Sequence, residues 1–124
     1  MAKTFMQAIA TMEGFYRTGS RANRNNNPGN LNLAPWESIL GAVLETIPPG
    51  VDEKARFAHF PTPVAGWTAM RMLLEDVYLG LTIAEALRKW APPSDGNDQS
   101  SYLVGVCKMT GMEPDTVLTK ENVG

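Results

Sequence analysis

The chain has few of the residues that bind metals or cross-link a fold. Its 124 residues include one cysteine and one histidine, so an internal disulfide and a zinc site built from a Cys/His cluster are both excluded. Cys107 lies in an apolar run, from Leu103 to Met109, which favours a buried structural thiol over a nucleophile. We therefore expect no metal and no cofactor.

A strong charge of one sign and a long hydrophobic run are missing as well. The net charge is −2, which excludes a generally basic nucleic-acid-binding protein. No stretch approaches the ~18–20 apolar residues of a membrane span. The N-terminus lacks the apolar core and the small-residue cleavage site of a secretory signal. We expect no nucleic-acid partner, no membrane insertion and no signal peptide.

Apolar residues are abundant enough to form one hydrophobic core. Hydrophobic residues make up 44% of the chain and charged residues 19%, a balance typical of a folded protein rather than a disordered one. A length of 124 residues is typical of one domain. We expect residues 1–124 to form a single, monomeric domain.

Helical periodicity at the start of the chain gives way to an irregular stretch. Apolar residues recur at helical spacing over residues 4–13, which predicts a first helix with one buried face. Residues 14–36 are rich in Asn, Gly and Pro and show no helical period, whereas residues 56–60 alternate like a short strand. This order predicts a mainly α (α+β) fold with a small irregular β-containing lobe, at about residues 29–61, after the first helix.

Helix signals dominate the remainder of the chain. Thr62-Pro63 offers an N-cap followed by proline at the first helical position. Thr82 and Glu85 have the spacing of a capping box, and Gly111 is placed to end a later helix. These signals predict a helical half at about residues 62–118.

One acidic residue, Glu13, stands out at the end of the first predicted helix. A polar, turn-rich stretch follows it directly. A carboxyl group between a buried helix and such a loop can be partly desolvated while a substrate still reaches it. General acids for glycoside cleavage need that environment. The alternative is a solvated helix-end residue, which position alone does not exclude.

Several short motifs follow one another in order around and beyond this residue. They are Met12-Glu13-Gly14-Phe15, the run Asn25 to Leu31 (Asn-Asn-Asn-Pro-Gly-Asn-Leu), Arg56 to Phe60, Gly66-Trp67, and Trp90 to Pro93 with Asn97 and Tyr102. Their order and spacing resemble the lysozyme-like superfamily, above all the phage-type peptidoglycan hydrolases and the catalytic domain of soluble lytic transglycosylases. The resemblance implies a lysozyme-like fold. It also implies cleavage of the β-1,4 bond between N-acetylmuramic acid and N-acetylglucosamine, with Glu13 as the general acid.

Candidate substrate contacts come from the loop, the lobe and a late helix. Asn30, beyond the Pro-Gly turn, is the preferred contact, because amide groups hydrogen-bond well to sugar hydroxyl and N-acetyl groups; Ser20 and Asn27 are further candidates. The same run would also suit a tight turn with no part in binding. Phe57 is either a sugar-stacking side chain or a packing residue of the lobe. The resemblance implies a tyrosine hydroxyl near the acid, at Tyr102.

A hydrolase that activates water needs a second carboxylate across the sugar from the acid. Glu37 and Glu45 are possible, but Asp52 and Glu53 are the preferred candidates, because they precede the predicted strand of the lobe. A lytic transglycosylase needs no such group, since a hydroxyl of the substrate attacks. The two reaction outcomes stay open.

Three arginines, Arg17, Arg21 and Arg24, lie between Glu13 and Glu37 in a stretch without any acidic residue. Beside a substrate site they would attract peptidoglycan, whose stem peptides carry carboxylates. The alternative is an ordinary solvated surface.

The sequence therefore predicts an enzyme that degrades bacterial peptidoglycan, either a glycoside hydrolase (a lysozyme or muramidase) or a lytic transglycosylase. We expect a phage endolysin released with the help of a holin, or a virion-associated lytic enzyme. The main alternative is a catalytically inactive lysozyme-like binding or structural component of a virion. A small adaptor protein is a third possibility.

Overall fold

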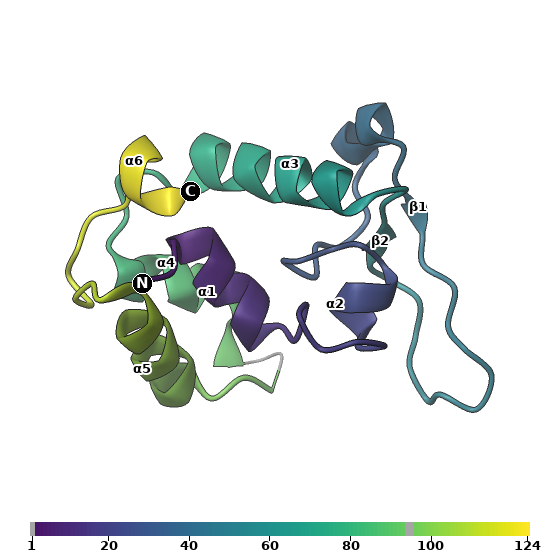
Figure 1. The fold of residues 1–124 in the computed structure, drawn as a ribbon, viewed down its shortest axis with the longest axis horizontal. Helices are drawn as coiled ribbons and strands as arrows, with labels where there is room; N and C mark the ends of the chain where they lie inside the picture. Colours follow the sequence, from purple (N-terminus) through teal and green to yellow (C-terminus); the bar gives the residue numbers. More distant parts are fainter. Residues whose placement is uncertain (1, 94–95) are drawn as a thin grey trace. The chain divides into compact units, whose positions relative to one another are not determined.

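The helices and strands of the chain are described by a computed structural model that covers residues 2–93 and 96–124 (Figure 1). Helices dominate, and two short strands form a small antiparallel sheet, so the predicted mainly α (α+β) class is confirmed. In chain order the elements are α1 (Phe5–Met12), α2 (Arg21–Arg24), the 3-10 helix η1 (Pro35–Leu40), β1 (Val43–Leu44), β2 (Ala58–His59), α3 (Pro63–Leu73), the π-helical turn η2 (Leu74–Tyr78), α4 (Ile83–Trp90), α5 (Gln99–Thr110) and α6 (Lys120–Val123).

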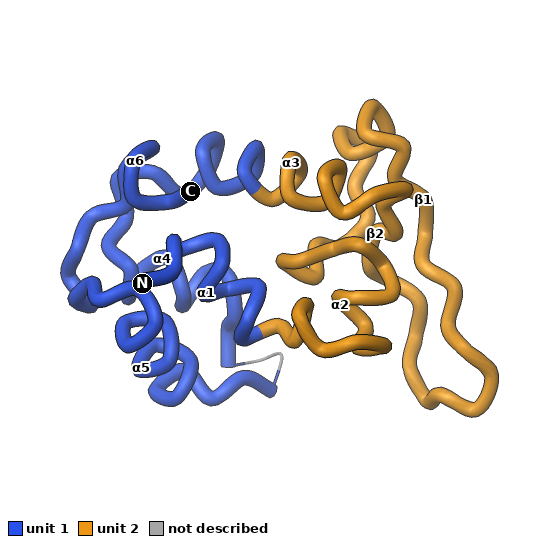
Figure 2. The backbone as a smooth tube through the Cα atoms, viewed as in Figure 1, with its two compact units in different colours: residues 1–12, 71–124 blue, residues 13–70 orange. Residues whose placement is uncertain are grey.

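The chain divides into two compact units (Figure 2). Unit 1 comprises residues 1–12 and 71–124, and unit 2 comprises residues 13–70. Unit 2 holds both strands and also takes in the turn and the loop that follow α1, so it begins at Glu13 rather than near residue 29. The candidate acid is the first residue of the unit that carries the sheet.

Local capping signals set the ends of the unit 1 helices. Ahead of α1, the Thr4 and Gln7 side chains accept each other's backbone N–H groups, at 3.1 and 3.0 Å. Thr82 and Glu85 form the predicted capping box of α4. Gly111 ends α5 with a left-handed φ of 75°. Each signal acts within about one helical turn, which is why the sequence alone places these helix ends.

The apolar faces of four helices form the core of unit 1. α1 packs against α5 and α6, and α4 packs against α5. α6 lies beyond residue 118, where the helical half was predicted to end. Within the part of the chain that the structure describes, no helix is both long and apolar enough to cross a bilayer. The largest fully buried apolar side chains of this unit are Phe5, Ile9, Leu74, Ile83, Leu87, Val106, Leu118 and Val123.

The sheet of unit 2 is shorter than the alternating pattern predicts. Only Ala58–His59 of the strand predicted over residues 56–60 pair with β1. The following residue turns to the loop instead, because Phe60 N donates to Asn25 O at 2.9 Å. The antiparallel register pairs Val43 with His59 and Leu44 with Ala58.

A short helix, α2, forms inside the stretch that shows no helical period. Ser20 is its N-cap, and the Ser20 Oγ atom accepts a hydrogen bond from Asn23 N at 3.1 Å. The helix spans four residues, which is too short for an apolar repeat to appear in the sequence. Capping by a side chain, rather than burial of an apolar face, is therefore the local signal for α2.

Candidate functional site

Glu13 lies where α1 gives way to a tight turn. The residue is half-buried and directly follows Met12, the last residue of α1. Gly14 has a left-handed φ of 80°, which glycine adopts without the strain that a side chain would cause. The Gly14 carbonyl accepts hydrogen bonds from Arg17 N at 3.0 Å and from the Ser20 hydroxyl. The turn after Glu13 is thus held by its own backbone and by the N-cap residue of α2.

The side-chain amide of Asn30 reaches the Glu13 carboxyl group. Asn30 Nδ2 donates to Glu13 Oε1 at 2.9 Å, and it lies 3.5 Å from the Glu13 carbonyl oxygen. Asn30 has a φ of 50°, a left-handed conformation that asparagine tolerates better than most residues. A half-buried carboxyl group beside a neutral amide is able to give or take a proton. The predicted contact of Asn30 with substrate stays a prediction, and the bond to Glu13 is what the structure adds.

Two other asparagines of the run turn their amides towards β2. Asn26 Nδ2 donates to Phe60 O at 3.0 Å. Asn27 is completely buried, and its Nδ2 donates to Leu31 O and Ala58 O at 3.0 and 2.9 Å, while its Oδ1 accepts from Leu31 N at 2.9 Å. These amides close the loop and attach it to the strand. Asn27 therefore helps to hold the loop in place, and its predicted contact with substrate also stays a prediction.

The first half of α3 supports both the loop and the turn of the candidate acid. A Cβ atom at Gly66 would lie 1.8 Å from Asn26 O and 2.9 Å from Pro28 Cδ, so only glycine lets the loop backbone come this close. At the next position, the Trp67 ring packs edge to face on Phe15, with 5.5 Å between centroids. The Gly66-Trp67 pair, noted in the sequence as a motif, therefore packs against the loop at Asn26 and against the turn at Phe15.

A buried carboxylate, Glu45, joins α2 to the sheet. Its side chain has 0% exposure. It accepts hydrogen bonds from Arg21 Nε and Nη2 at 3.0 and 2.6 Å and from Asn25 Nδ2 at 3.0 Å. The backbone N–H groups of Arg56 and Phe57 add two more, at 3.1 and 2.8 Å. We call these five residues the Glu45 cluster.

Hydrogen bonding keeps Glu45 ionised in spite of its burial. Burial alone would raise the pKa of Glu45, but the hydrogen bonds from Arg21, the two backbone N–H groups and Asn25 outweigh it and lower the pKa to about 2. Sequence reasoning named Glu45 only as one possible second catalytic carboxylate. Nothing in the spacing of Arg21 and Glu45 signals that they meet, since they are brought together by the fold.

The preferred candidates for the second carboxylate differ in their surroundings. Both residues are exposed, and Glu53 forms ion pairs with Arg21 Nη1 at 3.0 Å and with Arg24 Nη2 at 3.1 Å. Two of the three arginines expected to attract an anionic polymer therefore face a carboxylate of unit 2. Catalytic parts for Asp52 and Glu53 stay predictions.

The Phe57 ring is covered by cations. Phe57 is 8% exposed, and the guanidinium carbons of Arg21 and Arg56 lie over the ring, 4.2 and 4.5 Å from its centroid. Such cation–π contacts stabilise a packed aromatic side chain. The arrangement suits the packing alternative that the sequence left open, and sugar stacking on Phe57 stays a prediction.

Glu37 is a second buried carboxyl group of unit 2. Its Oε1 atom accepts from Ala34 N at 2.6 Å, while Oε2 has no hydrogen-bond partner among the described residues. Burial raises the pKa of Glu37, and the bond from Ala34 opposes that effect. Because Glu37 is 0% exposed, we assign it to the start of η1 and not to substrate.

Tyr102 lies on α5 of unit 1 and is 5% exposed. Its predicted place in the site stays a prediction. No group of three His, Cys, Asp or Glu side chains within residues 2–93 and 96–124 could hold a metal ion.

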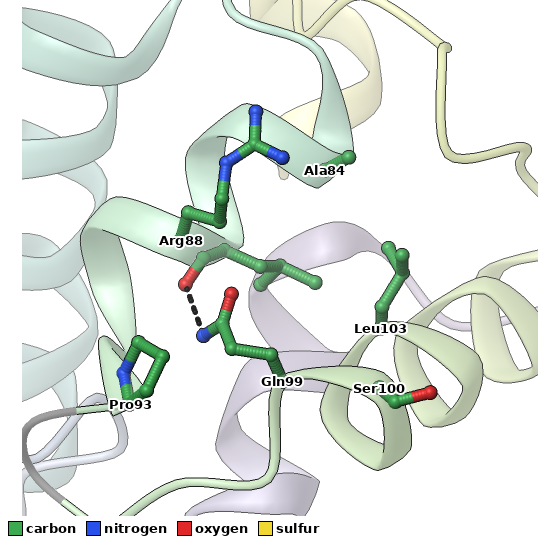
Figure 3. Close-up of a pocket in the computed structure, with 7 residues that line it drawn as sticks. Ala84, Arg88, Pro93, Gln99, Ser100 and Leu103 are labelled. Atoms are coloured by element: carbon green, nitrogen blue, oxygen red, sulfur yellow. Dashed lines mark hydrogen bonds between the residues drawn. The ribbon is translucent and has the colours of Figure 1, made fainter.

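Unit 1 contains a pocket of about 430 Å³ between α4, α5 and the chain that joins them (Figure 3). Gln99 Nε2 donates to the Leu87 carbonyl oxygen at 3.4 Å, and Figure 3 shows the Gln99 side chain among the residues that line the pocket. None of the lining residues that the structure describes carries a carboxyl, imidazole or thiol group, so these residues offer no acid–base side chain. They are Ala84, Leu87, Arg88, Pro93, Gln99, Ser100 and Leu103.

The chain matches no protein-family model and no curated protein. Function is therefore inferred from the residues around Glu13 and from the resemblance of the sequence motifs.

Proposed function

We propose that this chain is a peptidoglycan glycosidase that cleaves the β-1,4 bond between N-acetylmuramic acid and N-acetylglucosamine, with Glu13 as the general acid. The observation that carries the proposal is the 2.9 Å hydrogen bond from Asn30 Nδ2 to Glu13 Oε1. It holds a half-buried carboxyl group beside a loop that α3 braces at Gly66. The order of the sequence motifs, which resembles that of the lysozyme-like superfamily, supports the same assignment.

In the first chemical step of the proposed reaction, the Glu13 carboxyl group acts as the acid. As the glycosidic C–O bond breaks, the proton of Glu13 passes to the oxygen of the leaving sugar, and Glu13 is left ionised. In a hydrolase, water then adds to the sugar carbon and gives its proton to a carboxylate. In a lytic transglycosylase, the C6 hydroxyl of the same muramic acid adds and gives its proton back to Glu13. Both routes need a carboxyl group held in place through a full cycle.

Product analysis separates the two routes. Mass spectrometry of digested peptidoglycan detects new reducing ends after hydrolysis and 1,6-anhydromuramic acid after transglycosylation. If reducing ends form, we expect Asp52→Asn or Glu53→Gln to lower activity. If anhydro products form, we expect both variants to stay active, because no second carboxylate is needed.

The proposal is tested by Glu13→Gln, which keeps the size of the side chain and removes its acid. We expect wall cleavage, measured by zymography and by release of soluble fragments, to fall about 10²–10⁴-fold with an unchanged circular dichroism spectrum. Glu121→Gln, at an exposed position of α6, is the matched control. A folded Glu13→Gln variant with more than about a tenth of the activity, far above that range, overturns the assignment. Wild-type protein that binds walls without cleaving them identifies a binding component of a virion instead.

A further inference from the structure

We propose that Asn30 is a positioning residue whose amide serves the Glu13 carboxyl group in both of its protonation states. The inference rests on the proposed function and deepens it. Asn30 Nδ2 donates to Glu13 Oε1 at 2.9 Å, which suits an ionised carboxyl group, because such a group only accepts hydrogen bonds. A protonated carboxyl group has one O–H donor and needs an acceptor in addition.

The other end of the same amide supplies that acceptor. Within the part of the chain that the structure describes, Asn30 Oδ1 is buried and accepts no hydrogen bond. A half-turn about the Cβ–Cγ bond exchanges Nδ2 and Oδ1, which are nearly the same size. Oδ1 then faces Glu13 and accepts the proton of its acid form. The half-turn gives up the long 3.5 Å contact of Nδ2 with the Glu13 carbonyl oxygen, and the hydrogen bond from the protonated carboxyl group to Oδ1 compensates for that loss.

Neighbouring asparagines lack this freedom. Both ends of the Asn27 amide are bonded to backbone, Nδ2 to Leu31 O and Ala58 O and Oδ1 to Leu31 N. A half-turn there would break three hydrogen bonds. Asn26 shares the left-handed backbone of Asn30, with φ values of 52° and 50°, but its amide is bonded to Phe60 O. Asn26 therefore provides a matched control for changes at Asn30.

The backbone allows a clean removal of the amide. Glycine adopts a φ near 50° without strain, so Asn30→Gly and Asn26→Gly preserve the loop conformation and remove one side chain each. Asn30→Asp keeps the shape of the side chain but replaces the Nδ2 donor by an oxygen that repels ionised Glu13.

Two substrates separate positioning of the acid from support of the fold. The first is a tetrasaccharide of alternating N-acetylglucosamine and N-acetylmuramic acid. The second is a 4-nitrophenyl glycoside of the same sugars, whose leaving group departs with little help from an acid. We expect Asn30→Gly and Asn30→Asp to lower kcat on the tetrasaccharide about 10–100-fold, as misplacement of a catalytic group does, with KM nearly unchanged. On the nitrophenyl glycoside the loss should be less than about threefold, since general acid catalysis matters little there.

The control variant and the wild type complete the test. Asn26→Gly should lose stability to urea but keep most of its kcat on both substrates. Equal losses on both substrates in Asn30→Gly, or equal kcat in Asn30→Gly and Asn26→Gly, overturn the positioning role while Glu13 remains the acid. Wild-type protein inactive on both substrates and on whole walls overturns the proposed function itself.

Discussion

At the scale of single residues, the asparagine run shows how one residue type takes several parts. Asn25 binds the buried carboxylate of Glu45, Asn27 bonds only to backbone, and Asn30 turns to Glu13. All three are polar residues of a turn-rich stretch, and nothing in the sequence tells which partner each amide binds. The direction of each amide depends on which strand or carboxyl group the fold brings beside it.

Replacement of Gly66 tests whether the loop needs the close approach of α3 to the Asn26 backbone. Alanine in place of glycine inside a helix usually stabilises a protein by about 1 kcal/mol. Here the new Cβ would lie 1.8 Å from Asn26 O, a rigid backbone atom. We therefore expect Gly66→Ala to lower the free energy of unfolding by about 1–3 kcal/mol, as overpacking does, and to reduce wall cleavage. Urea denaturation and the release of wall fragments measure the two effects.

Gly105→Ala is the comparison for that variant, because Gly105 is also a helical glycine. Its new Cβ would meet Met12 Sδ at 2.8 Å, and a flexible thioether moves aside more easily than a backbone carbonyl. A smaller loss of stability in Gly105→Ala than in Gly66→Ala supports a structural need for the close approach of Gly66 to Asn26 O. Equal stability of Gly66→Ala and the wild type would show that the loop does not need this close approach.

At the scale of elements, the Glu45 cluster connects α2 to the sheet by charge. Its carboxylate accepts five hydrogen bonds, and Arg21 adds a bond to Lys54 O at 2.8 Å. A buried ion pair of this kind is favourable only when every group finds a partner. The short elements of unit 2 have little apolar surface to pack, since both residues of β1 are exposed. We infer that polar contacts set the register of this unit.

The Glu45 cluster predicts a loss of stability in acid. The pKa of Glu45 is lowered from an ordinary value of 4.5 to about 2, so its ionised form stabilises the fold. That contribution, on the order of 3 kcal/mol, is complete above pH 4.5 and is lost as the pH falls from 4.5 to 2. We expect Glu45→Gln to be less stable than the wild type at neutral pH. Its stability should also change less over this acid range.

Urea midpoints measured at several pH values check this prediction. Glu121→Gln, which changes an exposed carboxylate of α6, should keep the pH dependence of the wild type. If the urea midpoints of Glu45→Gln and the wild type fall equally steeply with pH between pH 4.5 and 2, other carboxyl groups control acid unfolding.

At the scale of the whole molecule, the charges are nearly balanced, with 11 basic and 13 acidic residues. Folding pairs part of the positive charge of the stretch between Glu13 and Glu37 with carboxylates from other parts of unit 2. Arg21 and Arg24 lie in a stretch without acidic residues, yet both pair with Glu53, and Arg21 also pairs with Glu45. Their charges are therefore partly neutralised within unit 2.

This pairing predicts a weak effect of salt on wall binding. We expect binding of Glu13→Gln protein to purified walls, measured by co-sedimentation, to change less than about threefold between ~0.05 and ~0.5 M salt, because screening acts mainly on exposed, unpaired charges. Arg17→Gln should leave the profile unaltered if Arg17 is solvated surface. A drop of about tenfold or more, abolished in Arg17→Gln, would instead show steering by Arg17.

Fold class and helix ends of unit 1 could be predicted from the sequence because their signals are local. Thr82 and Glu85 cap α4 and Gly111 ends α5 with no help from distant residues. The strand over residues 56–60 was only partly predictable. Phe60 bonds to Asn25 O in the loop, and such a competing partner does not appear in the alternation of apolar and polar residues.

The sequence by itself determined the mainly α class, the apolar faces of the helices and the place of Glu13 at the end of α1. Only the tertiary structure decided that Asn30 meets Glu13, that Asn27 closes the loop, and that Arg21 holds Glu45. Helix formation depends on contacts within about one turn of chain, which the order of residues records directly. A buried hydrogen bond depends on where two distant segments meet, and each buried donor must find an acceptor there. The candidate acid is therefore placed by the sequence, and its hydrogen-bond partner is placed by the fold.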